Sequence, residues 1–172
     1  MRTAMVLGGF MIKVCETGHR PKNLPWGYNE KSSECKKFKH NLTKLLKQLI
    51  KEGCTYFVSG MAMGVDMIFA ETILKLKEKN DLTLEAAIPC ENQTKGWTAE
   101  YIERYNKILS KADVVTYVSK KYTNDCMMKR NKYMVDGCDY VVAVCKEGLH
   151  GGTKNTIEYA KKSNKKIYFI NL

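Results

Sequence analysis

Short apolar runs alternate with longer amphipathic segments along the chain, and this alternation restricts the fold more than any other feature. Runs rich in β-branched residues predict strands at 11–16, 55–58, 82–88, 114–118, 140–145 and 166–170. A period of about 3.6 residues predicts helices at 33–51, 66–79, 99–110, 125–136 and 153–163. Strands that alternate with helices form a mostly parallel sheet covered on both faces. The sequence therefore predicts an α/β fold, a Rossmann-like three-layer sandwich.

Length and composition indicate a single domain. The 172 residues with 44% hydrophobic content are enough for one core. Residues 1–10 precede a second methionine, Met11, and we interpret them as a leader or extension before a domain at 11–172. No apolar run approaches the ~18 residues needed to cross a bilayer, so we expect a cytoplasmic protein. Seven scattered cysteines without a C-x-x-C pair predict reduced thiols, and we expect no metal and no cofactor.

The net charge of +11 and the pI near 9.3 make nucleic acid one candidate partner. The lysines, however, are spread over the polar faces of the predicted helices, which is typical of a solvated surface. Arginine is scarce, so an arginine beside glycines or in a polar loop is a candidate for bidentate recognition of phosphate or carboxylate. Arg20 and Arg130 meet this description.

The segment Ser-Gly-Met-Ala-Met-Gly-Val-Asp at 59–66 joins a predicted strand to a predicted helix. Strand, glycine turn and helix start, in that order, present free backbone N–H groups to a phosphate. Gly60 and Gly64 can take positive φ and let an anion approach the main chain, while Ser59 or Asp66 can cap the helix or hold a ribose hydroxyl. We include Met61 in this predicted site. The spacing matches neither a Walker A loop nor a dinucleotide fingerprint, and a plain connecting turn is the alternative.

The polar segment after the first predicted strand offers groups for an anion and a base. Thr17 and Gly18 form a turn, His19 and Arg20 can each contact an anion, and Trp26 can stack on a base. In an open α/β sheet such segments meet at the carboxyl ends of the strands, where ligands bind. In the alternative interpretation, Arg20 pairs with a carboxylate and Trp26 covers an edge of the core.

Two more segments follow later strands. The polar loop at 89–97, which carries an aromatic residue, is most simply a solvated connection, with a rim around a nucleoside as the alternative. The helix at 125–136 carries an arginine, and the glycines before the last helix form a second anion cradle, with an ordinary capped helix start as the alternative. The residues predicted to bind ligand in this part of the chain are Arg130, Asn131, Gly151, Gly152 and Thr153.

Four of these motifs together resemble the YpsA-like branch of the SLOG superfamily. They are Thr-Gly-His-Arg-Pro at 17–21, the turn at 59–66, Arg-Asn at 130–131 with Met134, and Gly-Gly-Thr at 151–153. The resemblance runs from Met11 to the C-terminus. It implies a Rossmann-like fold related to DprA and the LOG phosphoribohydrolases, binding of nucleotides or nucleotide-derived signals, and a homo-oligomer. SLOG domains in antiphage systems sense cyclic ADP-ribose-type molecules, and YpsA-like proteins also occur in phages and prophages.

The enzymatic branch of the superfamily is matched only in part. In LOG enzymes an arginine and a glutamate cleave an N-glycosidic bond, and Arg130 and Glu158 match these two in spacing. In the glycine-rich turn, however, His150 replaces a proline, Lys154 a glycine and Asn155 a threonine. A side chain in place of that glycine keeps the backbone away from a phosphate. The resemblance therefore favours binding without hydrolysis.

We expect a protein that binds an ADP-ribose-like or cyclic nucleotide signal, encoded by a bacterium or a phage, and in a phage sequestering a host immune signal. A LOG-like nucleotide N-glycosidase that acts through Arg130 and Glu158 is the first alternative. A DprA-like DNA-binding module is the second.

Overall fold

The computed structural model describes residues 10–146, 148 and 151–172. Most of the expected leader, at 1–9, lies outside the described residues, as does His150. The described chain forms one parallel sheet of six strands in the order β4-β3-β2-β1-β5-β6. The strands are β1 (Ile12–Thr17), β2 (Cys54–Ser59), β3 (Thr83–Ile88), β4 (Val114–Tyr117), β5 (Tyr140–Cys145) and β6 (Lys166–Asn171).

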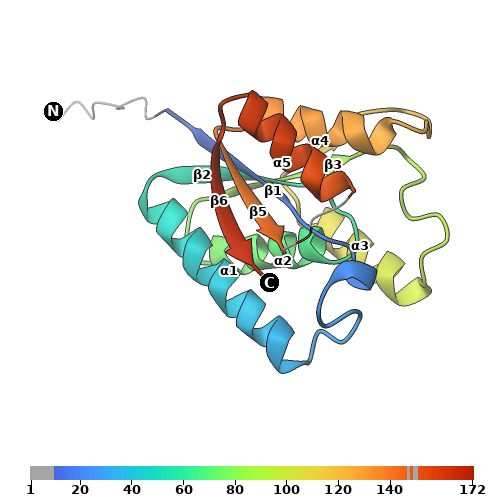
Figure 1. Ribbon diagram of the computed structural model, residues 1–172, viewed down its shortest axis with the longest axis horizontal. Helices are drawn as coiled ribbons and strands as arrows, with labels where there is room; N and C mark the ends of the chain where they lie inside the picture. Colours follow the sequence, from blue (N-terminus) through green and yellow to red (C-terminus); the bar gives the residue numbers. More distant parts are fainter. Residues whose placement is uncertain (1–9, 147, 149–150) are drawn as a thin grey trace, which may run out of the picture.

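Five α-helices connect the strands and cover the sheet. They are α1 (Ser33–Lys51), α2 (Val65–Lys77), α3 (Ala99–Leu109), α4 (Cys126–Gly137) and α5 (Gly152–Lys162). Figure 1 shows α1, α2 and α3 on one face of the sheet and α4 and α5 on the other. The expected three-layer α/β sandwich is confirmed, with element ends that differ from expectation by two residues or fewer. A short 3-10 helix, η1 (Pro21–Asn23), was not expected, and Pro21 begins it because its φ is already set for a helical turn.

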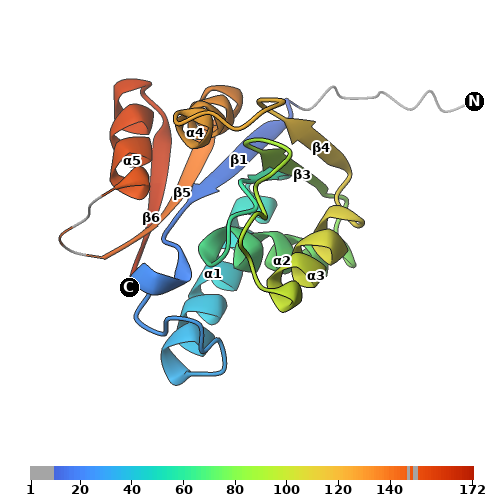
Figure 2. The same ribbon diagram turned by 90° about the vertical axis from the view of Figure 1, so that its right-hand side faces the viewer.

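The strand order reverses direction between β1 and β5. From β1 the chain moves outward through β2 and β3 to the edge strand β4, and α4 then returns it to β5 on the other side of β1 (Figure 2). The loops that leave the carboxyl ends of β1 and β5 therefore run to opposite faces of the sheet. At such a reversal they leave space for a ligand between them.

The main core lies between the sheet and the layer of α1, α2 and α3. Helix α1 begins at Ser32, whose Oγ accepts the N–H of Cys35 at 3.2 Å, and it turns Leu42, Leu46 and Leu49 completely inward. These leucines belong to one cluster with Phe57 and further side chains of the sheet and α2. All seven cysteines are buried free thiols. None of the helices in the described part of the chain is long and apolar enough to cross a membrane.

Substitution Leu46→Ala tests which face of α1 the core depends on. Leu46 is fully buried, so its truncation leaves a cavity and is expected to lower the free energy of unfolding by about 2–5 kcal/mol. The neighbouring Leu45 is only partly buried, and Leu45→Ala is the matched control with a clearly smaller loss. Urea denaturation measures both values. Equal losses for the two variants would contradict this orientation of the helix.

Candidate functional site

Buried polar side chains are concentrated at the carboxyl edge of the sheet. Of the ten polar or charged residues that are buried in the described part of the chain, nine belong to this edge or to the helix turns beside it, and Glu85 is the exception. Buried polar groups are costly unless they are hydrogen-bonded, so such a concentration indicates a functional site. The nine are Glu16, Thr17, His19, Ser59, Asp66, Gln93, Arg130, Thr153 and Thr156.

Arg130 lies at the centre of this group. Helix α4 directs its side chain towards the ends of β2 and β3, and only 4% of the residue is exposed. Its guanidinium donates to the carbonyl of Gly60 and, at 3.4 Å, to the carbonyl of Ala87, while Nε donates to Asn131 Oδ1 at 2.8 Å. Burial lowers the pKa of Arg130, and the negative charge of Asp66 acts against that change. The arginine therefore joins α4 to the turn after β2.

Two buried carboxyl groups, Glu16 and Asp66, accompany this arginine. Burial raises the pKa of Glu16 well above its ordinary value, and the negative charge of Asp66 raises it further. Burial also raises the pKa of Asp66, although the charge of Arg130 opposes this. Two carboxyl groups beside one cation favour a state in which one is ionised and the other keeps its proton. The side chain of Glu16 favours the protonated form, because burial and the neighbouring charge of Asp66 both act against its ionisation.

The turn at 59–66 uses its backbone N–H groups within the protein. Gly60 N–H donates to Glu16 Oε1 at 3.3 Å, and Ala62 N–H donates to Asp66 Oδ2 at 3.1 Å. Met61 N–H donates to Ser59 Oγ at 3.2 Å, and this hydroxyl donates to the carbonyl of Asp66 at 2.9 Å. The expectation of free N–H groups at 60–62 was therefore wrong, because the side chains of the chain itself accept these hydrogen bonds.

Close packing accounts for the glycines of this turn. A Cβ on Gly60 would lie 2.5 Å from Arg130 Nη1, and a Cβ on Gly64 would lie 2.6 Å from the carbonyl oxygen of His19. Gly64 also has a φ of 98°, which side chains rarely allow. The fully buried Met61 adopts a left-handed φ of 58°, an uncommon conformation for methionine that is typical of strained functional turns.

A second part of the site lies between the loop after β1 and the start of α5. Thr153 Oγ1 donates to the carbonyl of Gly18 at 3.0 Å and joins the two segments. Gly151 is the N-cap residue of α5, and its φ of 77° suits glycine, which has no side chain to cap the helix. The N–H groups of a first helical turn have no partner within the helix, so this end favours an anion.

Two side chains of the loop after β1, His19 and Arg20, follow Gly18 directly and have no strong polar partner among the described residues. His19 is buried, and its Nε2 has no hydrogen-bond partner among the described residues. Burial lowers the pKa of His19, and the charge of Lys146 lowers it further, so the ring is neutral at pH 7. Arg20 is exposed, and across residues 10–146, 148 and 151–172 its guanidinium has a weak contact with Met127 Sδ at 3.9 Å but no ion pair.

Asn131 and Gly152 connect the two parts of the site. The Asn131 side chain accepts from Arg130 and donates through Nδ2 to Thr156 Oγ1 at 3.0 Å. Thr156 in turn donates to the carbonyl of Gly152 at 2.8 Å in the first turn of α5. A continuous network of hydrogen bonds therefore runs from the turn after β2 through α4 to the start of α5.

The structure places two residues of the expected site elsewhere. Trp26 is buried in the core, where its ring stacks on Phe38 with centroids 5.1 Å apart, so it offers no free face to a base. Glu158 lies on the exposed face of α5, and its recorded partner is Lys154 at 3.8 Å. No recorded contact joins Glu158 to Arg130 within the described chain. The remaining predicted residues lie around the carboxyl edge of β1, β2 and β5.

Sequence reasoning missed three members of the site: Glu16, Gln93 and Thr156. Glu16 was visible as the charged last residue of the first predicted strand, which places it at the carboxyl edge. Gln93 belongs to the loop at 89–97, where we expected a solvated connection, yet it is buried and donates to the carbonyl of Gly60 at 3.1 Å. No group of three or more His, Cys, Asp or Glu side chains in the described chain is placed to hold a metal ion.

Substitution Glu16→Gln tests the buried proton. Because the folded state raises the pKa of Glu16, its contribution to stability is fully present below the unfolded pKa of roughly 4.3 and is lost as pH rises through the raised value. Glutamine is neutral at every pH, so the melting temperature of the Glu16→Gln variant relative to the original protein should rise as pH increases from the unfolded pKa towards the raised one. Calorimetry measures this difference. The exposed Glu158→Gln is the control, and a difference independent of pH for Glu16→Gln would contradict the shift.

Substitution Gly64→Ala tests the packing of the turn. The new methyl group clashes with the His19 carbonyl in a backbone conformation that suits glycine, so we expect a loss of at least about 1–3 kcal/mol in the free energy of unfolding. In Gly137→Ala the added Cβ meets open space, and the change should stay within roughly 0.5 kcal/mol. Urea denaturation compares the two. A Gly64→Ala protein as stable as the control would show that the turn can relax.

Comparisons with known proteins find relatives that match most of this chain. The SPbeta prophage-derived protein YoqJ of Bacillus subtilis (strain 168) is 31% identical over 141 residues, which are 74% of this chain and 82% of YoqJ. A UPF0398 protein of Bacillus thuringiensis (strain Al Hakam) is 30% identical over 168 residues, covering 93% of this chain and 90% of the relative.

A solved structure has the same fold. The X-ray structure of DNA processing protein A (DprA) from Streptococcus pneumoniae superposes with a TM-score of 0.64 at 18% sequence identity. The match covers 92% of this chain but only 50% of the DprA chain. The profile of the YspA SLOG family (YpsA) matches residues 14–172. This chain therefore belongs to the YpsA family of SLOG proteins.

Proposed function

We propose that the protein binds a nucleotide-derived small molecule, ADP-ribose-like or cyclic, between the loop after β1 and the start of α5. The observation that carries the proposal is the hydrogen bond from Thr153 to the carbonyl of Gly18, which joins the loop that carries His19 and Arg20 to the uncapped N-terminus of α5. Arg20 has no acidic partner in the described chain, and the Nε2 atom of His19 is buried without a hydrogen bond. An arginine, a histidine and free helix N–H groups are the donors that phosphate binding requires.

The two parts of the site have different roles in this proposal. The phosphates contact Arg20 and the first turn of α5, at Gly151, Gly152 and Thr153. The turn at 59–66 does not bind the phosphates, because N–H groups of this turn already donate to Glu16 and Asp66. Its role is to support the neighbouring parts of the site. Arg130 holds that turn in place and makes no direct contact with the ligand. This differs from the expectation that Gly60 and Gly64 hold the phosphates.

Binding without cleavage is favoured by the positions of the two expected catalytic residues. Glu158 is exposed and near Lys154, while the donors of Arg130 are directed to Gly60, Ala87 and Asn131. Cleavage of an N-glycosidic bond remains the second candidate because burial raises the pKa of Glu16, and a carboxyl group with a raised pKa suits a general acid. The test therefore measures affinity and also determines whether the bound ligand has been cleaved.

The relative YoqJ is described as prophage-derived, and this supports a viral origin for proteins of this kind. In that context, sequestration of a host immune signal is the role that we propose for the bound nucleotide. We also keep the expectations of a cytoplasmic location and a homo-oligomer as parts of the proposal.

Affinity for ADP-ribose and cyclic ADP-ribose isomers tests the proposal directly. Isothermal titration should show that Arg20→Ala weakens binding by at least about tenfold, because a charge-assisted hydrogen bond contributes roughly 1.5–3 kcal/mol. Lys22→Ala removes the same charge from a nearby exposed position and should change affinity by less than about twofold. Chromatography of the ligand released by denaturation should return it intact. Unaltered binding by Arg20→Ala would contradict the phosphate site, and a freed base would favour the N-glycosidase.

A further inference from the structure

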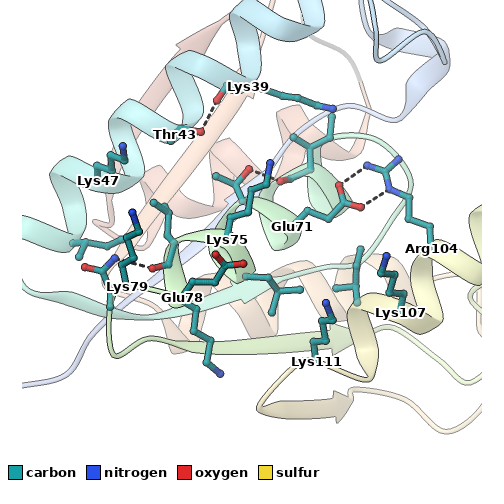
Figure 3. A pocket seen from close by; sticks show the side chains of 18 of the residues that line it. Lys39, Thr43, Lys47, Glu71, Lys75, Glu78, Lys79, Arg104, Lys107 and Lys111 are labelled. Atoms are coloured by element: carbon teal, nitrogen blue, oxygen red, sulfur yellow. Dashed lines mark hydrogen bonds and ion pairs between the residues drawn. The ribbon is translucent and has the colours of Figure 1, made fainter.

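A groove of about 1260 Å³ lies on the face of the molecule formed by α1, α2 and α3, away from the candidate site. Figure 3 shows Lys39 and Lys47, Glu71 and Lys75, and Lys107 around it, contributed by the three helices in turn. None of the nine buried polar residues of the carboxyl edge lines this groove. The groove is therefore separate from the proposed nucleotide site.

Positive charge dominates the lining of the groove. Nine basic side chains line it, against two acidic ones, Glu71 and Glu78. Arg104 neutralises Glu71 through hydrogen bonds of 2.8 Å and also pairs with Glu30, while Lys39 pairs with Glu30 and Lys77 with Asp113. Six lysines remain that form no ion pair with any described residue: Lys47, Lys51, Lys75, Lys79, Lys107 and Lys111.

The bottom of the groove is aliphatic. Ile50 from α1 and Leu74 and Leu76 from α2 are only partly buried and pack on the main core, with Ile68 and Ile108 beneath them. The lining therefore has two kinds of surface, a hydrocarbon floor and cationic walls. A ligand that matches both must carry apolar groups on one side and negative charge on its flanks.

This combination disfavours the other polyanions. The volume exceeds the roughly 300–1,000 Å³ of small-molecule sites. Single-stranded nucleic acids bind by stacking on aromatic side chains, and no aromatic residue lines the groove. The phosphate backbone of a duplex matches the lysines, but it leaves the aliphatic floor uncovered. An amphipathic helix with an apolar stripe and acidic flanks satisfies both surfaces at once.

We propose that this groove binds an acidic amphipathic helix of a partner protein. The apolar stripe of that helix packs on Ile50, Leu74 and Leu76. Its Asp and Glu side chains contact the free lysines of α1 and α3 on either side. A helix is about 10–12 Å wide with its side chains, a size that suits a groove between neighbouring helices. Because exposed lysines supply the charge, the affinity should fall as salt increases.

The test uses synthetic probes. One is a fluorescent peptide of about 18 residues with leucines at positions i, i+3, i+4 and i+7, glutamates on the two flanks and alanines on the outward face, where good helix formers stabilise the helix. A second peptide has the same composition in scrambled order, and the third probe is a DNA duplex of similar length. Fluorescence anisotropy with the full chain should show the striped peptide binding at least about tenfold more tightly than the scrambled one.

Charge-reversal variants locate the binding site. Lys47→Glu with Lys107→Glu should weaken the striped peptide by at least about tenfold. The control, Lys44→Glu with Lys162→Glu, makes the same change of net charge at exposed positions outside the groove and should stay within about twofold. Leu74→Asn, checked for folding by circular dichroism, should weaken the striped peptide without weakening binding of the duplex.

Three outcomes would overturn the proposal. Equal affinity for the striped and scrambled peptides would show that the floor makes no contribution. Tighter binding of the duplex, lost in Lys47→Glu with Lys107→Glu, would assign the groove to nucleic acid. Failure of the striped peptide to bind would exclude an acidic helix as the ligand.

Discussion

The contact of Arg130 with the carbonyl of Gly60 is the interaction on which the arrangement of the site depends. It fixes α4, which covers one face of the sheet, to the turn that leaves β2 for the opposite face. The guanidinium also compensates the charge of Asp66, which accepts the N–H of Ala62 in the same turn. Asn131 extends the network to α5, and Thr153 extends it to the loop after β1. The carboxyl edges of β1 and β2, α4 and α5 therefore hold their positions together. A change at one of them affects the geometry of the others.

A buried cluster of one arginine and two carboxyl groups is a costly way to stabilise a fold. Desolvation of the charges offsets much of their attraction, and apolar side chains of similar volume often give equal or greater stability. The neighbouring core shows that apolar packing is available to this chain, because α1 and α2 bury a continuous set of leucine, isoleucine and phenylalanine side chains. The polar cluster instead orients the backbone. Its carboxyl groups accept the N–H groups of Gly60 and Ala62, on either side of Met61, which adopts a left-handed conformation.

Sequence reasoning was most successful where local periodicity determines structure. The strands and helices were predicted with small errors at their ends because each has a regular apolar pattern, and their alternation determined the parallel sheet. The site was predicted less completely because burial and pairing depend on contacts far apart in the chain. Trp26 has the residue type of a base-stacking group, but Phe38, twelve positions later in α1, determines its location in the core. In the same way, the N–H groups of Gly60 and Ala62 become occupied only when β1 and α2 bring Glu16 and Asp66 to them.

The lysines of the groove form a surface that is separate from the site of Arg20 and Arg130. The lysine-rich composition indicated a solvated surface, but the fold gathers six lysines around one aliphatic floor, from three helices and the turns that follow two of them, and none of the six forms an ion pair with a described residue. No single helix has this property, because each alternates lysines with buried residues in the ordinary amphipathic pattern. The property arises when α1 and α3 pack on either side of α2 and bring their polar faces together. Without a ligand, these lysines contribute little to the stability of the protein, since like charges at close range repel one another. A ligand that neutralises them while covering Ile50, Leu74 and Leu76 relieves this repulsion and buries apolar surface in the same step.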